Sequence, residues 1–278
     1  MLRRREDIQL KSTEQLRLMR RAGLVVAEGL TRMAEAVEPG MSTLDLDAIA
    51  RKVLRAAHAD SNFLGYAGPP PFPAVICSSR NDTIVHGIPS KQDVLVEGDL
   101  ISLDFGAIVD GWHGDAAVTV EVGAVSAEDR ALSQACLASL WDGIAAGRVG
   151  GRLTDISHAI ETSVRAAGSY GIVTGYGGHG IGSQMHMDPH LPNYGRPGRG
   201  PRLLSGMTLA IEPMITAGSS DTRQLPDRWT VTTTDGGRAA HWEHTVALLE
   251  DGPWVLTAVD GGRAELASRG IQLSALAD

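Results

Sequence analysis

The sequence predicts a single α+β domain whose two related halves surround a mostly antiparallel sheet. Three observations support this class. Each half of the 278-residue chain supplies two segments with helical hydrophobic spacing, followed by several strand-like runs. The dipeptide Asp110-Gly111 joins two of these runs as a two-residue hairpin turn. The repeated order of helices and strands indicates an internal pseudo-repeat, although no residue-level identity links the halves.

The first half opens with two predicted helices. A capping-box pattern at Ser12 begins a helical segment that Pro39 ends. Ser42 and Asp45 begin the second helix, whose apolar residues form one stripe. Glycine and proline are frequent over residues 63–76, which predicts a loop. Strand-like runs lie at residues 74–77, 100–109 and 112–122.

The second half repeats this order. Ser126 with Asp129 caps a predicted helix that continues to about Ala146. Thr154 leads another predicted helix, which Gly168 ends. The remainder contains a glycine-rich stretch at 175–182, a loop at 189–201, and strand candidates at 208–216, 229–233, 242–249 and 254–258.

Composition and charge exclude several classes of protein. With 43% hydrophobic and 21% charged residues, the chain has enough apolar material for a core. A net charge of −8 argues against a broad nucleic-acid-binding face, and no apolar run is long enough to span a membrane. The two cysteines, Cys77 and Cys136, are typical of a reduced cytoplasmic protein. We therefore expect a cytoplasmic protein without nucleic-acid or membrane partners.

Two aspartates, Asp104 and Asp115, lie inside the strand-like runs that flank the hairpin turn. If the turn is as predicted, Val109 pairs with Trp112 and Gly106 with Asp115. Asp104 and Asp115 are then diagonal neighbours on one face, roughly 7–8 Å apart. Such carboxylates are costly unless they are paired or bind a cation. This stretch alone leaves two interpretations open, a metal site or a pair of acids at a sheet edge.

Three further polar residues occur in apolar or glycine-rich surroundings: His179 within GGHGIG, Glu212 within LAIEPM, and Glu243 within WEHTV. Each alone is more often a hydrogen-bonded structural residue than a ligand. Together with the two aspartates, the glutamates provide four negative charges, which two divalent cations would neutralise. Oxygen ligands with one imidazole suit Mn²⁺, Fe²⁺ or Co²⁺, and the absence of thiolates argues against structural zinc.

Five segments, NDTIVHGIP, SLDFGAIVDGWHGDAAVT, GGHGIG, LAIEPM and WEHTV, resemble in this order the motifs of type I methionine aminopeptidases. The resemblance covers residues 12–257. It implies the pita-bread fold, with residues 1–11 as an N-terminal extension and 12–278 as the catalytic domain. It also implies a site for two divalent ions (Co, Mn, Fe or Zn) with five ligands: Asp104, Asp115, His179, Glu212 and Glu243. Asp115 and Glu243 would bridge both ions, Asp104 would bind one, and His179 with Glu212 would bind the other.

The family reaction removes the initiator methionine from nascent proteins when the second residue is small and uncharged. A metal-bridging hydroxide attacks the scissile carbonyl in such two-metal hydrolases. By resemblance, Glu212 transfers the proton, His186 stabilises the oxyanion and His86 contacts the leaving amide. His86 and His186 would individually be ordinary loop histidines, and His190 is interpreted as part of a surface loop because Pro189 disrupts helical spacing.

The methionine side chain needs an apolar pocket with soft or aromatic walls. The positions that match the family pocket are Phe63, Tyr66, Phe72, Cys77, Met185 and Trp229. Core packing is the alternative role for each of them. Three departures from the family pattern stand out: a three-proline insertion at 69–71, Met185 where an aromatic residue is common, and His241 where glutamine is common.

Three other classes of protein share this fold or part of these motifs. Proline-specific peptidases of the same fold usually carry a separate N-terminal domain, and type II methionine aminopeptidases carry a helical insertion for which residues 182–208 leave no room. A metal-free binding module of this fold would lack one or more ligands, and all five are present. The resemblance implies N-terminal methionyl peptides and nascent chains as substrates and a monomeric enzyme. It leaves a transient association with ribosomes open.

Overall fold

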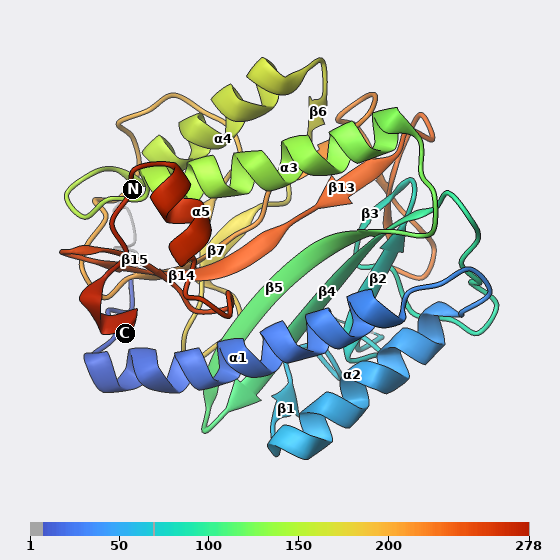
Figure 1. Cartoon of the computed structure of the whole chain (residues 1–278), viewed down its shortest axis with the longest axis horizontal. Helices are drawn as coiled ribbons and strands as arrows, with labels where there is room; N and C mark the ends of the chain where they lie inside the picture. Colours follow the sequence, from blue (N-terminus) through green and yellow to red (C-terminus); the bar gives the residue numbers. More distant parts are fainter. Residues whose placement is uncertain (1–7, 69, 278) are drawn as a thin grey trace.

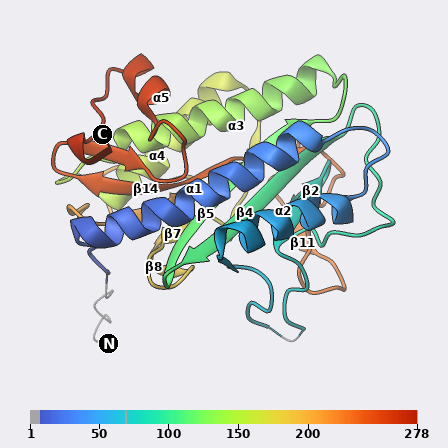
Figure 2. The same cartoon turned by 60° about the horizontal axis from the view of Figure 1, so that its bottom comes forward.

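One curled antiparallel sheet forms the centre of the molecule, and two pairs of helices pack against it (Figure 1). The computed structural model describes residues 8–68 and 70–277. The long helices are α1 (Thr13–Ala36), α2 (Thr43–Ala57), α3 (Ala127–Ala146) and α4 (Leu153–Ala167). Figure 2 shows α1 crossing over two strands of this sheet, β4 (Leu100–Val109) and β5 (Trp112–Glu121). This arrangement confirms the predicted α+β class with two helix pairs.

Side-chain caps determine where the first two helices begin. The hydroxyl of Ser12 accepts the backbone N–H of Gln15, whose side chain accepts the backbone N–H of Ser12 in return. Ser42 and Asp45 form the same reciprocal pair at the start of α2. Each pair satisfies two backbone donors that a helix end would otherwise leave without partners. The capping box predicted at Ser12 and the helix start predicted at Ser42 and Asp45 are therefore confirmed.

The C-terminal half begins its second helix one residue earlier than predicted. The carboxylate of Asp155 accepts the backbone N–H of Arg152, so α4 starts at Leu153 rather than at Thr154. The short helices α5 (Arg263–Ser268) and η1 (Ala275–Ala277) were not predicted. They are too short to show a clear hydrophobic period in the sequence.

The strands form one large and two small sheets. The nine-stranded sheet has the order β1-β4-β5-β14-β9-β7-β8, with β2 paired to β4 and β15 to β14. Its strands are β1 (Asp60–Ser61), β2 (Ile76–Arg80), β4 (Leu100–Val109), β5 (Trp112–Glu121), β7 (Gly178–Gly180), β8 (Met187–Leu191), β9 (Thr208–Ile211), β14 (Glu243–Leu249) and β15 (Gly252–Val255). The small sheets contain β6 (Gly171–Ile172), β10 (Met214–Thr216) and β13 (Ala239–His241), and β3 (Thr83–Val85), β11 (Thr222–Gln224) and β12 (Val231–Thr233).

The β4–β5 hairpin has the predicted register. Val109 pairs with Trp112 and Gly106 with Asp115. The turn residues have φ values of 50° at Asp110 and 78° at Gly111, as a turn with two left-handed residues requires. Asp104 pairs with Ala117, two residues beyond Asp115. Since side chains alternate along a strand, Asp104 and Asp115 lie diagonally on one face of the sheet.

The prediction of one continuous strand over residues 208–216 was wrong. It consists of β9 in the large sheet and β10 in a small sheet, with Glu212 and Pro213 between them. Pro213 has no N–H to donate to a strand ladder, which ends β9 at this point. Glu212 therefore lies just beyond a strand end. Its side chain does not have to follow the alternation between the two faces of the sheet that applies within a strand.

Apolar packing forms two main cores, one for each half. Phe105, Leu46 and Met33 are fully buried in the core under α1 and α2. Leu140 and Ile160 are fully buried in the core under α3 and α4. Within the described ranges, no helix is both long and apolar enough to cross a membrane.

Lys11 is the only buried residue among the described lysines and arginines, with 7% of its surface exposed. Its ammonium donates to the carbonyl of Gln9 at 3.0 Å, and burial lowers its pKa to about 8. Between this value and the ordinary value of 10.5, the unfolded chain binds more protons than the folded protein. The contribution of Lys11 to the free energy of unfolding should therefore rise with pH over this interval.

We expect Lys11→Met to remove this rise and to stabilise the protein at pH 7 by about 1–2 kcal/mol, because the aliphatic stem keeps its packing without a buried charge. Urea unfolding of both proteins at pH 7, 8, 9 and 10 would measure the effect. Lys91→Met, at an exposed lysine, is the matched control and should leave the pH dependence unchanged. A parallel pH dependence in Lys11→Met and the natural chain would contradict the assignment.

Candidate metal centre

Five strands or strand ends bring the predicted ligands to the middle of the large sheet. Asp104 lies on β4, Asp115 on β5, His179 on β7 and Glu243 on β14, while Glu212 directly follows β9. The adjacent strands β5, β14, β9 and β7 explain why residues so distant in sequence meet. All five side chains line one cavity of about 250 Å³.

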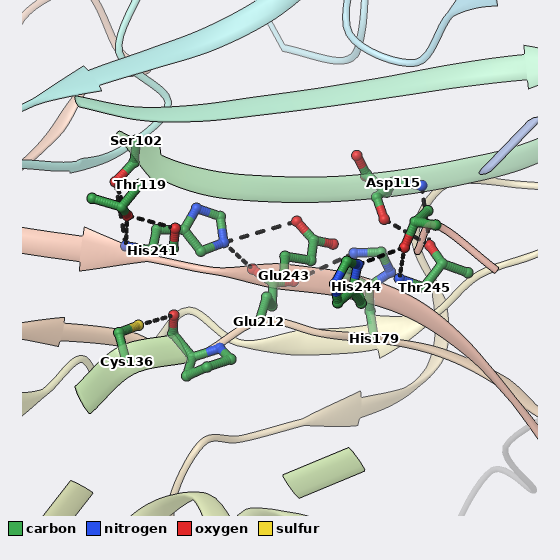
Figure 3. Close-up of polar contacts among 12 residues, drawn as sticks. Ser102, Asp115, Thr119, Cys136, His179, Glu212, His241, Glu243, His244 and Thr245 are labelled. Atoms are coloured by element: carbon green, nitrogen blue, oxygen red, sulfur yellow. Dashed lines mark hydrogen bonds and ion pairs between the residues drawn. The ribbon is translucent and has the colours of Figure 1, made fainter. Parts of the chain in front are cut away.

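Asp115, His179 and Glu243 form the tightest group. Each of the three offers one ligand atom, and these atoms lie within 4.8 Å of one another. The Nδ1 of His179 lies 2.9 Å from the carbonyl oxygen of Gly180, and a carbonyl can only accept. Nδ1 therefore carries the proton, and Nε2 presents a lone pair 3.4 Å from Glu212 Oε1. Figure 3 shows His179 and Glu212 on the same side of Glu243. An imidazole held in this way is oriented as a metal ligand.

Three carboxylate oxygens in the centre are buried without any hydrogen-bond partner among the described residues. They are Asp104 Oδ1, Asp115 Oδ1 and Glu243 Oε1. Leaving several such groups without a partner carries a large desolvation cost, which a cation would offset. Oxygen donors with one neutral imidazole suit divalent ions. The residues present therefore fit a divalent metal site.

The pKa values of these groups reflect their burial and the closeness of the carboxylates to one another. Burial, and then the charges of neighbouring carboxylates, raises the pKa of Asp104, Asp115 and Glu243 well above its usual range. Burial and the charge of Asp115 raise the pKa of Glu212 to about 8. Burial lowers the pKa of His179 to about 3, which keeps its imidazole neutral. In the metal-free protein, protons neutralise these neighbouring carboxylates, and a bound cation would take over that role.

An apolar wall lies beside the carboxylates. Phe63, Phe72, Cys77 and Met185 pack together there, with Tyr66 and Trp229 against them, so all six predicted pocket residues line the same cavity. The rings of Phe72 and Trp229 meet edge to face at 5.3 Å. Within the three-proline insertion, the carbonyl of Pro70 accepts the indole N–H of Trp229 at 3.0 Å. Pro69 lies outside the described residues, whereas Pro70 thus contacts one wall of the pocket.

Comparisons with known proteins agree with this arrangement. The sequence profile of metallopeptidase family M24 matches residues 17–250. Methionine aminopeptidase 1 of Mycobacterium tuberculosis is 58% identical over 257 residues, covering 91% of this chain and 96% of that protein. Methionine aminopeptidase 1 of Bacillus subtilis is 45% identical over 242 residues, with 87% and 96% covered. The chain belongs to metallopeptidase family M24, among its type I methionine aminopeptidases. This confirms the resemblance seen in the motifs.

Solved structures of the methionine aminopeptidases have the same fold. The enzyme from Thermotoga maritima superposes with a TM-score of 0.87 at 37% identity, covering 90% of this chain and 99% of that one. Prolidase from Pyrococcus furiosus superposes with a TM-score of 0.70 at 19% identity, and this chain covers 65% of it. The second likeness shows the shared pita-bread fold alone.

The two further histidines predicted for a methionine aminopeptidase also line the cavity. The phenol of Tyr66 lies 2.6 Å from Nδ1 of His186, whose ring centroid is 4.3 Å from that of His179. His86 has a left-handed backbone, with φ of 60°, and its ring contacts that of Trp229 at 6.3 Å. Burial lowers the pKa of His86 to about 4 and also lowers that of His186. Both imidazoles are therefore neutral near pH 7.

The interpretation of His190 as surface loop was wrong. It lies on strand β8, pairs with His179 and lines the cavity, although its side chain is exposed. Pro189 suggested a loop, but β8 is the edge strand of the sheet, where a residue without an N–H is tolerated. Tyr176 and Met214 also line the cavity, and the sequence analysis did not identify them. The glycine-rich stretch beside Tyr176 and the Glu212-Pro213 pair beside Met214 were the signals that could have indicated them.

Proposed function

We propose that this protein removes the N-terminal methionine from peptides and nascent chains whose second residue is small and uncharged. The observation that carries the proposal is the group Asp115, His179 and Glu243, with unpartnered carboxylate oxygens, beside an apolar pocket. A metal centre of this kind activates water, and a soft pocket selects a thioether side chain. The two features together suit the hydrolysis of a methionyl peptide bond.

Two divalent ions are proposed, because the four carboxylates supply four negative charges. Asp115 and Glu243 would hold both ions, Asp104 one of them, and His179 with Glu212 the other. When bound, such ions acidify water to a nucleophile, polarise the scissile carbonyl and anchor the free α-amine. Co, Mn, Fe and Zn are all compatible with these ligands.

The remaining polar groups are proposed to transfer protons and to stabilise the negative charge of the oxyanion. Glu212 lies at a strand end, and its side chain lines the cavity, so its carboxylate is proposed to take a proton from the attacking water and return it to the leaving amine. A phenol that donates to Nδ1 of His186 leaves the proton of that ring on Nε2. This N–H is our proposed donor to the oxyanion. His86 is proposed to contact the leaving amide.

The apolar wall determines which first residue is accepted. The edges of Phe72 and Trp229, together with the sulfur atoms of Met185 and Cys77, give the methionine side chain polarisable contacts. Sulfur contacts with aromatic rings contribute roughly 0.3–1.5 kcal/mol each. Each of these residues could serve core packing alone, so their role stays a prediction.

A peptide assay tests the proposal. Protein freed of metal by chelator and reconstituted with Mn²⁺ or Co²⁺ should release methionine from Met-Ala-Ser. The chelator-treated protein should not. Met-Leu-Ser should be cleaved at least about tenfold more slowly, since each methylene that a pocket discriminates is worth a factor of this order. Equal turnover of the two peptides would refute the specificity, and inactivity with every metal would favour a metal-free binding module.

Substrates of this kind imply where the enzyme works. Nascent chains carry their initiator methionine as they leave the ribosome, which places the proposed reaction in the cytoplasm. We propose a monomer that contacts ribosomes only transiently. Sedimentation of the purified protein, alone and with ribosomes at low salt, would test both statements.

A further inference from the structure

His241 is a buried imidazole that the proposed mechanism leaves without a role. It ends strand β13, and only 2% of its surface is exposed. Its Nε2 has no hydrogen-bond partner among the described residues. The same atom lies 3.8 Å from Oε2 of Glu212 and 3.8 Å from Oε2 of Glu243, as the dashed lines in Figure 3 show. One nitrogen therefore faces the outer oxygens of two proposed metal ligands.

The backbone of His241 is held from two strands. Its N–H donates to the hydroxyl of Thr119 at 3.0 Å and to that of Ser102 at 3.3 Å. Its carbonyl accepts the hydroxyl of Thr119 at 2.8 Å, and the two hydroxyls are 2.9 Å apart. These contacts tie His241 to β4 and β5, which also carry two of the proposed ligands. The backbone from which the imidazole projects is therefore held at a fixed place.

The opposite side of this segment is also fixed. The thiol of Cys136 on α3 lies 3.2 Å from the carbonyl oxygen of Pro213 and 3.4 Å from that of Ala240. Pro213 follows Glu212, and Ala240 precedes His241, so one side chain contacts both segments. Cys136 therefore lies against the backbone of both segments that carry the two facing side chains, those of Glu212 and His241.

The chemistry of the facing groups decides which tautomer is useful. Metal-bound carboxylates are anionic and only accept hydrogen bonds. An imidazole with its proton on Nε2 is the matching donor, and one N–H can be shared between two acceptors. The 3.8 Å separations exceed a hydrogen bond, but the terminal torsion of a glutamate has a broad minimum and can close such a gap.

We propose that His241 is a positioning residue whose Nε2–H is shared by the outer oxygens of Glu212 and Glu243, and that this bond orients both carboxylates toward the metal ions. The inference rests on the proposed metal-dependent function. Hydrogen bonds to ligating carboxylates typically change metal affinity or activity by about 10–100-fold. His241 thus supports metal binding without being a ligand itself.

The test measures metal binding as well as activity. Titration calorimetry of Mn²⁺ into the chelator-treated protein should show affinity reduced by about 10–100-fold in His241→Ala. His241→Gln should stay within about threefold of the natural chain, because its amide keeps an N–H donor at a similar reach. His241→Leu fills the space without a donor and should match His241→Ala, which covers the case in which the alanine variant does not fold. His158→Ala, at an exposed histidine, is the control.

Activity separates positioning from a general loss of structure. In His241→Leu, kcat on Met-Ala-Ser should fall while KM changes little, because the apolar wall is untouched. Normal Mn²⁺ affinity in both His241→Ala and His241→Leu would overturn the proposal. Loss in His241→Gln equal to that in His241→Ala, with a changed visible spectrum of the Co²⁺ protein, would instead make His241 a direct ligand. If no variant and no natural protein cleaves the peptide, the metal titrations still decide the role of His241.

Discussion

Replacing Glu243 by glutamine should abolish hydrolysis and, at the same time, raise the melting temperature of the chelator-treated protein. Glu243 is 3% exposed, and its Oε1 has no partner in the part of the chain that the structure describes. Burial and three neighbouring carboxylates raise its pKa well above the usual range. The unfolded chain ionises this acid freely above pH 4.5, so its burial costs stability at neutral pH.

The amide of glutamine has nearly the same shape, carries no charge and can donate to the neighbouring carboxylates. A gain of several degrees at pH 8 is expected without metal, since about 1.4 kcal/mol corresponds to one pKa unit. The loss of the charge of this proposed metal ligand should lower kcat/KM by at least about a thousandfold, because metal catalysis supplies several kcal/mol.

Thermal denaturation in the presence of chelator and a peptide assay with added Mn²⁺ measure the two effects. Glu250→Gln is the matched control, since Glu250 directly follows the same strand but is exposed. It should change neither quantity. A variant at Glu243 that keeps its activity, or that melts earlier without metal, would show that this carboxylate is not a buried charge held for metal binding.

The part of the site that could be predicted from local sequence is the β4–β5 hairpin. Asp110-Gly111 specifies the turn, the turn specifies the register, and the register places Asp104 and Asp115 on one face. This chain of reasoning needs only neighbouring residues and the two-residue period of a strand. It left a metal site and a pair of edge acids equally open, because both have the same local pattern.

Long-range pairing supplies the rest of the site and cannot be read from one segment. Glu243 reaches the centre because it pairs with Ala117 of β5, more than a hundred residues earlier in the chain. His179 reaches it because it pairs with Ala210 of β9. Only the resemblance of the ordered motifs to a known family predicted that these residues lie close together. At residues where this chain departs from the family, such as His241, a role could be inferred only from the contacts in the structure.

The same four carboxylates that suit metal binding should make the metal-free protein unusually sensitive to alkali, between pH 6.5 and 8. In this interval, an exposed glutamate in the unfolded chain is already ionised, whereas folded Glu212 keeps its proton until pH about 8. The folded state therefore binds more protons, and the free energy of unfolding falls as pH rises. Buried histidines such as His179 oppose this trend near pH 6.5, where about half of the unfolded imidazoles are still protonated, but each contributes less over the interval than one of the four carboxylates.

The melting temperature of the chelator-treated protein should drop by at least about 3 °C from pH 6.5 to pH 8, since about 1 kcal/mol moves it by 2–4 °C in a domain of comparable size. Mn²⁺ should restore stability, and more strongly at pH 8, because the ion competes with protons for the carboxylates. Glu212→Gln should flatten the slope without metal, while Glu250→Gln should not. A melting temperature that is constant or rises over this interval would mean that these acids are ionised and paired in the folded protein, which is incompatible with a site that needs cations to balance its charge.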